Sequence, residues 1–367
     1  MLDLIHGEPS WCLSHDRVRL WVTQVGGHMA PVEFTLGERR VSPYALAPWQ
    51  AADIDESLPV LLKVLRGDFL CFPFGPQDKA PPHGAPANAE WKIVAGGDNL
   101  LHLGLDDADS GAWVEKILAL KDGETAIYCE HRISGAAGRY SYGNHPVIDF
   151  TSMPEGAARI SVSPFRFGLV YPGFFANPVN REYGILKQGA RFTDLREVPL
   201  ATGGNADLSG YPGRQGFEDL VMMTNEPATP EQPFAWSAAV MDGYLWFSLK
   251  NPADFPSTLL WISNGGRHGA PWNGRHLGRM GIEEVCSYFA DSVTISRKDP
   301  LAAEAVPTSR EFRKDETVSL RIVQAVAAVP QDFGTTVSIV PAGPGKVKIT
   351  GDSGHCVETS IDWNFVL

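Results

Sequence analysis

The chain has 367 residues, of which 44% are hydrophobic and 20% are charged, a composition typical of a globular protein with a sizeable core. This composition excludes an intrinsically disordered chain. The Gly and Pro residues follow no repeat, which excludes a collagen-like chain. The net charge of -12 repels phosphate backbones and anionic lipid headgroups. We therefore expect no nucleic-acid partner and no membrane partner, and a neutral small molecule suits the chain better.

Short stretches with alternating or β-rich composition predict strands along the whole chain. In chain order they are residues 17–25, 32–36, 100–105, 113–120, 126–134, 159–163, 236–241, 244–249, 258–262, 281–288, 319–326 and 346–350. Between them lie dipeptides typical of tight turns, and Asp242-Gly243 is the clearest hairpin signal. Helical periodicity is weak, and residues 57–65 and 300–305 are among the few short candidates. The pattern predicts an all-β sandwich with few short helices, in a single domain of residues 1–367.

The cysteines and the N-terminus bear on the cellular compartment. The five cysteines are widely separated and none has CxxC spacing, which indicates neither a disulfide framework nor a zinc site. The N-terminal residues lack the basic and apolar regions of a signal peptide, and no apolar run is long enough to span a membrane. We expect a cytoplasmic protein.

Two long irregular segments, residues 73–89 and 264–279, each contain histidines. Long ordered loops in compact proteins are often functional. The second segment combines Trp272 and His276 with Arg and Asn residues, which are groups that stack on sugar rings and bond to their hydroxyls. Trp272 is therefore a candidate sugar platform and His276 a candidate pocket residue. The alternative is that this loop is a structural cover whose Trp fills a gap in the sandwich.

A series of motifs follows in order along residues 60–290. They are R-G-D at 66–68, C-F-P-F-G at 71–75, H-G at 83–84, N-A-E-W at 88–91, G-N-H-P at 143–146, G-F-E-D at 216–219 and G-I-E-E at 281–284. This order resembles the aldose 1-epimerases, which are galactose mutarotase-like proteins, and especially their hexose-6-phosphate 1-epimerase branch. The resemblance implies a β-supersandwich fold, opening and reclosing of a sugar ring at C1, and no cofactor.

The resemblance also implies roles for individual residues. Glu283 would be the base, His145 the acid, and His83 would orient the region of the ring oxygen. Arg66 would hold a hydroxyl or support a carboxylate. Anomer interconversion does require one base and one acid, and burial or a nearby arginine would set the pKa of the base in opposite directions.

Each residue also has a structural interpretation. Taken alone, Arg66 suits an ion pair at a turn, His145 the end of a loop, and His83 an exposed loop position. Glu283 and Glu284 are neighbours on a predicted strand, so only one of them can face the site, and the resemblance selects Glu283. The pair formed by Glu218 and Asp219 poses the same question, and there we favour Asp219.

Two positions depart from the family pattern. The phosphate-binding arginine of the H-G-F-A-R motif is absent after His83-Gly84, and Glu284 replaces the proline of G-x-E-P. We therefore expect an isomerase that interconverts the α and β anomers of an aldose without a metal, and the sugar is either unphosphorylated or a derivative outside the common hexoses. The alternatives are a non-catalytic carbohydrate-binding protein on the same scaffold and, in third place, a polysaccharide lyase or hydrolase. The sequence leaves the sugar, the pathway and the oligomeric state open.

Overall fold

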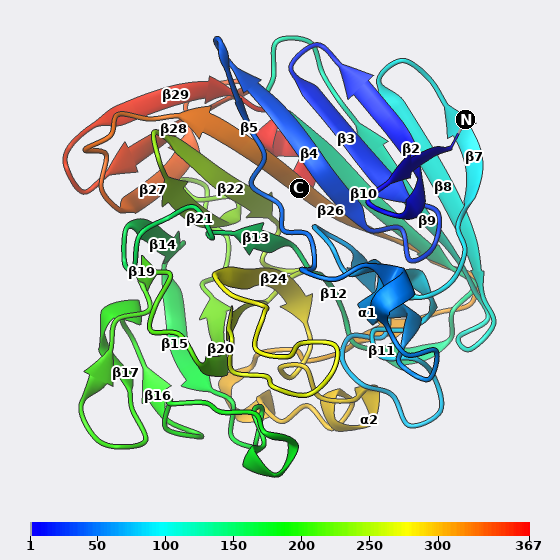
Figure 1. Ribbon diagram of the computed structural model, residues 1–367. Coiled ribbons are helices and arrows are strands. Elements are labelled where there is room, and N and C mark those ends of the chain that lie inside the picture. Colours follow the sequence, from blue (N-terminus) through cyan, green and yellow to red (C-terminus); the bar gives the residue numbers. More distant parts are fainter. Residues whose placement is uncertain (1) are drawn as a thin grey trace.

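The N-terminal part of the chain forms a five-stranded antiparallel sheet (Figure 1). The computed structural model describes residues 2–367. The sheet consists of β1 (Asp3–Ile5), β2 (Glu8–His15), β3 (Val18–Thr23), β4 (Met29–Leu36) and β5 (Arg39–Val41), in that order.

The largest sheet has nine strands, and its pairings are antiparallel. From edge to edge it contains β19 (Gly210–Tyr211), β14 (Ala158–Val162), β21 (Ala235–Met241), β22 (Tyr244–Lys250), β26 (Thr317–Ala328), β10 (Ala126–Ser134), β9 (Ala112–Ala119), β8 (Leu100–Asp107) and β7 (Lys92–Gly96). The predicted hairpin joins β21 to β22, and Gly243 adopts the positive φ of 69° that this turn requires.

An eight-stranded sheet carries the candidate site. Its order is β16 (Arg191–Phe192), β15 (Phe165–Val170), β20 (Phe217–Asn225), β23 (Ser257–Asn264), β24 (Arg279–Cys286), β12 (Tyr142–Asn144) and β6 (Leu70–Cys71), with β13 (Val147–Asp149) also paired to β24. In Figure 1 its strands β15, β20 and β24 lie below the long strands of the nine-stranded sheet.

Smaller elements complete the fold. The two α-helices are α1 (Val60–Val64) and α2 (Val293–Ser296), and the small sheets are β11 (Gly138–Tyr140) with β25 (Arg310–Phe312), β17 (Val198–Pro199) with β18 (Asn205–Ala206), and β27 (Thr336–Pro341), β28 (Lys346–Gly351) and β29 (Cys356–Ser360). The six short 3-10 turns are η1 (Ala51–Asp53), η2 (Ala85–Ala87), η3 (Pro178–Asn180), η4 (Leu195–Glu197), η5 (Ala302–Glu304) and η6 (Trp363–Val366). Across residues 2–367, no helix reaches the length and apolarity that crossing a membrane requires.

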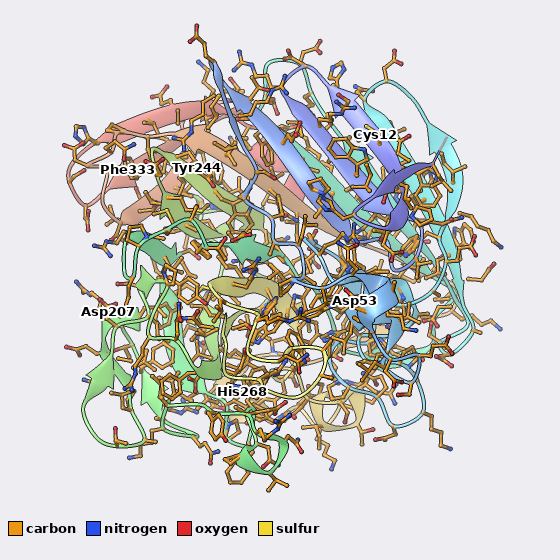
Figure 2. The ribbon with its side chains drawn as sticks, in the orientation of Figure 1. Cys12, Asp53, Asp207, Tyr244, His268 and Phe333 are labelled. Atoms are coloured by element: carbon orange, nitrogen blue, oxygen red, sulfur yellow. The ribbon has the colours of Figure 1, made fainter. Side chains whose placement is uncertain are left out.

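Hydrophobic side chains gather in three clusters, each set by the alternation of side chains along the strands. The largest joins the three large sheets, with Phe34, Leu320 and Ile282 among its buried members. A second covers the opposite face of the eight-stranded sheet and includes Leu220 and Trp261. The third packs β27 and β28 against the nine-stranded sheet. Figure 2 shows how densely side chains fill the space between the strands.

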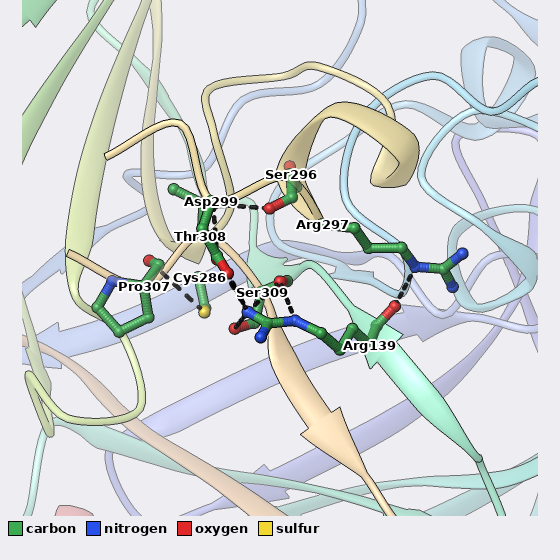
Figure 3. Close-up of polar contacts among 8 residues, drawn as sticks. All are labelled: Arg139, Cys286, Ser296, Arg297, Asp299, Pro307, Thr308 and Ser309. Atoms are coloured by element: carbon green, nitrogen blue, oxygen red, sulfur yellow. Dashed lines mark hydrogen bonds and ion pairs between the residues drawn. The ribbon is translucent and has the colours of Figure 1, made fainter. Parts of the chain in front are cut away.

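A polar network fixes the segment that follows β24 (Figure 3). Arg139 of β11 pairs with Asp299 at 2.7 Å, and its Nε donates to the hydroxyl of Ser309 at 3.0 Å. Arg297 donates from Nε to the carbonyl of Arg139, and Thr308 donates to the carbonyl of Ser296 at 2.7 Å. These bonds hold the turn around α2, which follows β24 in the chain, against β11.

The predicted fold class is confirmed: the chain is all-β with few short helices. The strand predicted at 126–134 has the bounds of β10, whereas the predicted helices shrink to the five residues of α1 and the three of η5. The prediction missed β20, whose sequence FEDLVMMTN shows no alternation and has few of the β-branched residues that are enriched in strands.

Candidate functional site

A cavity of about 350 Å³, here called the site cavity, lies on the face of the eight-stranded sheet that the second cluster covers. Its volume is at the lower end of the range for small-molecule sites. Strands β20, β23 and β24 form its floor, and helix α1 and several loops form its walls. The polar and aromatic residues that matter most here are His83, His145, Glu283, Arg267, Trp261 and Trp272.

Strand β24 directs Glu283 into the site cavity. Glu283 lies opposite Leu259 of β23 and shares its face, whereas Glu284 points to the other face and pairs with Lys250 at 2.5 Å. Gly281 lies one pleat away on the same face as Glu283. A Cβ at position 281 would lie 2.4 Å from Oε1 of Glu283, so the glycine leaves room for the carboxyl group.

His145 follows β12 and meets Glu283 in the cavity. Its Nε2 lies 3.2 Å from Oε1 of Glu283, and both side chains are buried. The imidazole stacks on Phe69 at 4.5 Å, and the amide of His145 donates to the carbonyl of Phe69 at 3.0 Å. Nδ1 of His145 is buried and has no hydrogen-bond partner among the described residues.

His83 is held by a strained turn in the loop of residues 73–89. It has a positive φ of 63°, and its amide donates to the carbonyl of Gly75 at 2.8 Å. The amide of Gly75 in turn donates to Nδ1 of His83 at 3.3 Å. In a neutral imidazole this bond assigns the proton to Nε2, so that Nε2 is a hydrogen-bond donor.

The ionisable groups of the cavity favour their neutral forms. Burial, together with the charge of Glu284, raises the pKa of Glu283 well above its usual value. Burial, together with His83, lowers the pKa of His145 well below its usual value, and burial lowers the pKa of His83 to about 4. The directions of these pKa shifts favour a single transferable proton in the close pair of Glu283 and His145, on the carboxyl group rather than on the imidazole.

Aromatic rings and one arginine form another wall of the cavity. Trp261 and Trp272 meet edge to face at 5.8 Å, and the guanidinium of Arg267 lies 5.0 Å from the rings of both Trp272 and Phe175. Nε of Arg267 has no hydrogen-bond partner within residues 2–367. The arginines of this loop, residues 264–279, count among the groups suited to sugars, but the sequence motifs did not select Arg267, which lies five residues before Trp272.

His276 supports this wall from behind and does not line the cavity. It stacks on Trp261 at 5.4 Å, and its Nδ1 lies 2.6 Å from the hydroxyl of Ser263. Glu218 accepts hydrogen bonds from Nε1 of Trp261 at 2.9 Å and from Ser263 at 2.7 Å. The expected pocket residue His276 is thus part of the layer that orients Trp261.

Two other expected substrate residues lie outside the site cavity. Arg66 turns toward β1, where it donates to the carbonyl of Ile5 at 2.9 Å, and its Nε donates to the carbonyl of Val64 in α1 at 3.2 Å. Asp219 precedes Leu220 in β20, so its side chain lies on the other face of the strand. There it accepts hydrogen bonds from the amides of Ile185 and Leu186, both at 3.1 Å. Backbone groups provide the hydrogen-bond partners of both side chains in these positions.

The comparisons with known proteins bear on the fold. No protein-family model matches the chain, and no curated protein matches it. Among solved structures, a galactose mutarotase related enzyme from Lactobacillus acidophilus is similar with a TM-score of 0.57 and 10% identity, over 87% of this chain and 97% of that one. A candidate aldose 1-epimerase from Escherichia coli K12 has a TM-score of 0.57 and 13% identity, over 87% and 99%. This chain has the galactose mutarotase-like fold.

Within this mutarotase-like fold, motifs far apart in sequence converge on one cavity. His83, His145 and Glu283, which the motif order singled out, all line it together with Trp272. The two long loops also meet there, because residues 73–89 supply Pro76 and His83 and residues 264–279 supply Arg267 and Trp272.

Proposed function

We propose that the protein is an isomerase that interconverts the α and β anomers of an aldose. The observation that carries the proposal is the contact between Nε2 of His145 and Oε1 of Glu283, 3.2 Å apart in a cavity of sugar size. Ring opening removes the proton from the C1 hydroxyl and adds a proton to the ring oxygen. Both oxygens are bonded to C1, so the acid and the base must lie side by side, as this pair does.

The proton balance of the proposed reaction closes within this pair. Glu283 gives its proton to the ring oxygen as the bond between C1 and that oxygen breaks, and His145 takes the proton of the C1 hydroxyl as the carbonyl forms. Rotation about the bond between C1 and C2 exposes the other carbonyl face, and the reverse transfers close the ring. The directions of the pKa shifts support this assignment, which exchanges the roles that the sequence resemblance implied.

The remaining groups would bind and orient the sugar. Nε2 of His83 would donate to a ring or hydroxyl oxygen, and the guanidinium of Arg267, which lines the cavity, would donate to another hydroxyl. The faces of Trp261 and Trp272 suit the apolar C–H face of a pyranose. No step requires a cofactor.

We propose an unphosphorylated sugar as the substrate. Arg267 is the cationic residue that lines the site cavity among the described residues, and Glu182 lies 3.8 Å from its Nε. Asp291 adds a further carboxyl group to the lining. A dianionic phosphate would meet these carboxyl groups without the arginine that the related motif supplies.

Polarimetry on freshly dissolved α anomers tests the proposal. The wild type should accelerate mutarotation of at least one common aldose more than its 6-phosphate. Glu283→Gln should reduce the acceleration by about 10²-fold or more, which is the range for loss of a general acid or base. Glu226→Gln, which changes an exposed carboxylate after β20, is the matched control and should retain full activity.

Binding measured by calorimetry separates the two candidate functions. The changes at the family motifs favour the carbohydrate-binding protein as the second candidate. Saturable binding of sugars that show no accelerated mutarotation would support that candidate and would contradict the isomerase.

A further inference from the structure

A second cavity, of about 480 Å³, adjoins the site cavity. It lies along the segment of residues 170–188 and the start of β20. Four residues, Tyr171, Phe174, Phe175 and Leu220, belong to the walls of both cavities. The two hollows are therefore neighbours along one wall, and the second is the larger.

The side chain at their junction is unusual for a surface residue. Phe174 is 69% exposed, although a phenylalanine ring is normally buried. Tyr183, on the same segment, lines the second cavity and is 43% exposed. Both rings therefore line the second cavity and are also open to solvent, and aromatic faces are what sugar rings stack on.

The segment that carries Phe174 is anchored at several points. The carbonyl of Asn177 accepts the amide of Glu182 at 3.1 Å, and the amide of Tyr183 donates to the carbonyl of Gly266 at 3.0 Å. Further on, Asp219 accepts the amides of Ile185 and Leu186. A surface fixed in this way costs little further ordering when a ligand binds.

The second cavity also provides polar groups for a sugar. Lys187 and Gln188 line it and are exposed, and both can bond to hydroxyls. An apolar platform with a few polar groups around it is the usual composition of a small-molecule site. The reaction at C1 leaves the other hydroxyls of the sugar unused, so one of them can carry a second ring.

We propose that the substrate is a reducing oligosaccharide that occupies both cavities. Its reducing-end ring lies against His145 and Glu283, and its next ring stacks on Phe174. This inference rests on the proposed function and narrows its substrate class from aldoses in general to chains of at least two rings. Asp219, which was expected at the sugar, lines the second cavity and there supports the segment that binds the second ring.

The test compares each monosaccharide with disaccharides that end in the same reducing sugar. The pairs are D-glucose with maltose, cellobiose and lactose, and D-galactose with galactobiose. The measured quantity is kcat/KM for mutarotation, for the wild type, for Phe174→Ala and for Val179→Ala. Val179 is the matched control, because it is 87% exposed on the same segment and lines neither cavity.

The wild type should prefer one disaccharide over its monosaccharide by about tenfold, and Phe174→Ala should remove most of that preference. Val179→Ala should keep it. Mutarotation of monosaccharides with no preference for any disaccharide would overturn this inference and leave the isomerase intact. If no sugar is turned over, the proposed isomerase function fails, and calorimetry with the same sugar pairs tests the inference. Equal affinities for monosaccharide and disaccharide would overturn it. A preference for the disaccharide that Phe174→Ala abolishes would uphold it.

Discussion

Glu283 and Glu284 are adjacent in β24, but their carboxyl groups lie on opposite faces of the sheet. Glu284 accepts hydrogen bonds from Ser248 at 2.7 Å and Thr258 at 2.7 Å and pairs with Lys250. Glu283 faces the site cavity, where burial and the charge of its neighbour raise its pKa. One strand thus places a carboxylate that pairs with Lys250 next to one that faces the cavity.

The raised pKa of Glu283 predicts a cost in stability at neutral pH. Above the ordinary pKa of 4.5 the unfolded chain loses this proton while the folded protein keeps it. The free energy of unfolding therefore falls by about 1.4 kcal/mol per pH unit from this group until the folded carboxyl ionises. Glu283→Gln should become increasingly more stable than the wild type between pH 4.5 and 7 in urea denaturation. A constant difference across this range would contradict the shift.

The glycine beside this carboxyl predicts a loss of activity without a loss of fold. In Gly281→Ala the new Cβ would displace the end of the Glu283 side chain, because it would lie 2.4 Å from Oε1. We expect kcat to fall about 10- to 100-fold with a smaller change in KM, since the contact with His145 is disturbed. Gly97→Ala is the control, because a Cβ there meets nothing within 4 Å. Equal kcat values for the two variants would refute this role.

The buried pair of Lys250 and Glu284 predicts a large effect when only one charge is removed. Lys250→Met should reduce the free energy of unfolding by about 3–5 kcal/mol, because it leaves Glu284 buried without its partner. The double variant Lys250→Met with Glu284→Gln should recover part of that loss. It should also move the ionisation of Glu283 to lower pH in the rate profile, since the charge of Glu284 raises the pKa of Glu283. A profile identical to that of the wild type would count against this coupling.

The buried neutral histidines predict a large loss in the free energy of unfolding as the pH falls. Burial lowers the pKa of five histidines below the ordinary 6.5, to about 4 for His83 and about 3 for His28, and well below the ordinary value for His131, His145 and His276. As the pH falls through 6.5, the unfolded chain takes up protons that the folded protein refuses, so stability is lost. Urea titrations should show the wild type losing stability between pH 6 and 4. In His83→Asn the free energy of unfolding should change with pH less steeply, by about 1.4 kcal/mol per pH unit. An unchanged slope would show that His83 does not contribute to this loss of stability.

Two arginines should behave in opposite ways. Arg66→Gln removes charged hydrogen bonds to backbone carbonyls and should cost about 2–3 kcal/mol of stability while kcat/KM stays within about twofold. Arg267→Gln should raise KM about tenfold with little loss of stability, because Arg267 lines the cavity. Thermal melts and steady-state rates on the same preparations distinguish the two roles. A large rise in KM for Arg66→Gln would instead indicate that Arg66 binds the substrate.

Much of the site could be predicted because its residues belong to motifs in a fixed order. His83, His145 and Glu283 meet in one cavity although up to 200 residues separate them. The alternation of β-strands also allowed only one of Glu283 and Glu284 to face the cavity. These features depend on the local sequence, on the positions of glycines and on the alternation of side chains between the two faces of a strand.

The structure differs from the expectations where tertiary contacts decide the direction of a side chain. Arg66 stands in an expected motif, but carbonyls of the N-terminal strands draw it away from the cavity. Arg267 enters the cavity because three aromatic rings from separate segments surround it. Strand β20, which contributes Leu220 to the floor, has no alternation in its sequence, and both of its faces are buried.

The tryptophans in the cavity wall give this protein an optical signal of its own. Trp261 and Trp272 are two of the ten tryptophans, and both contact the guanidinium of Arg267 as well as the space where a sugar would bind. A ligand that bonds to that guanidinium changes the polarity beside both indoles. Intrinsic fluorescence should therefore report sugar binding without labels and without turnover, even in variants that no longer move a proton.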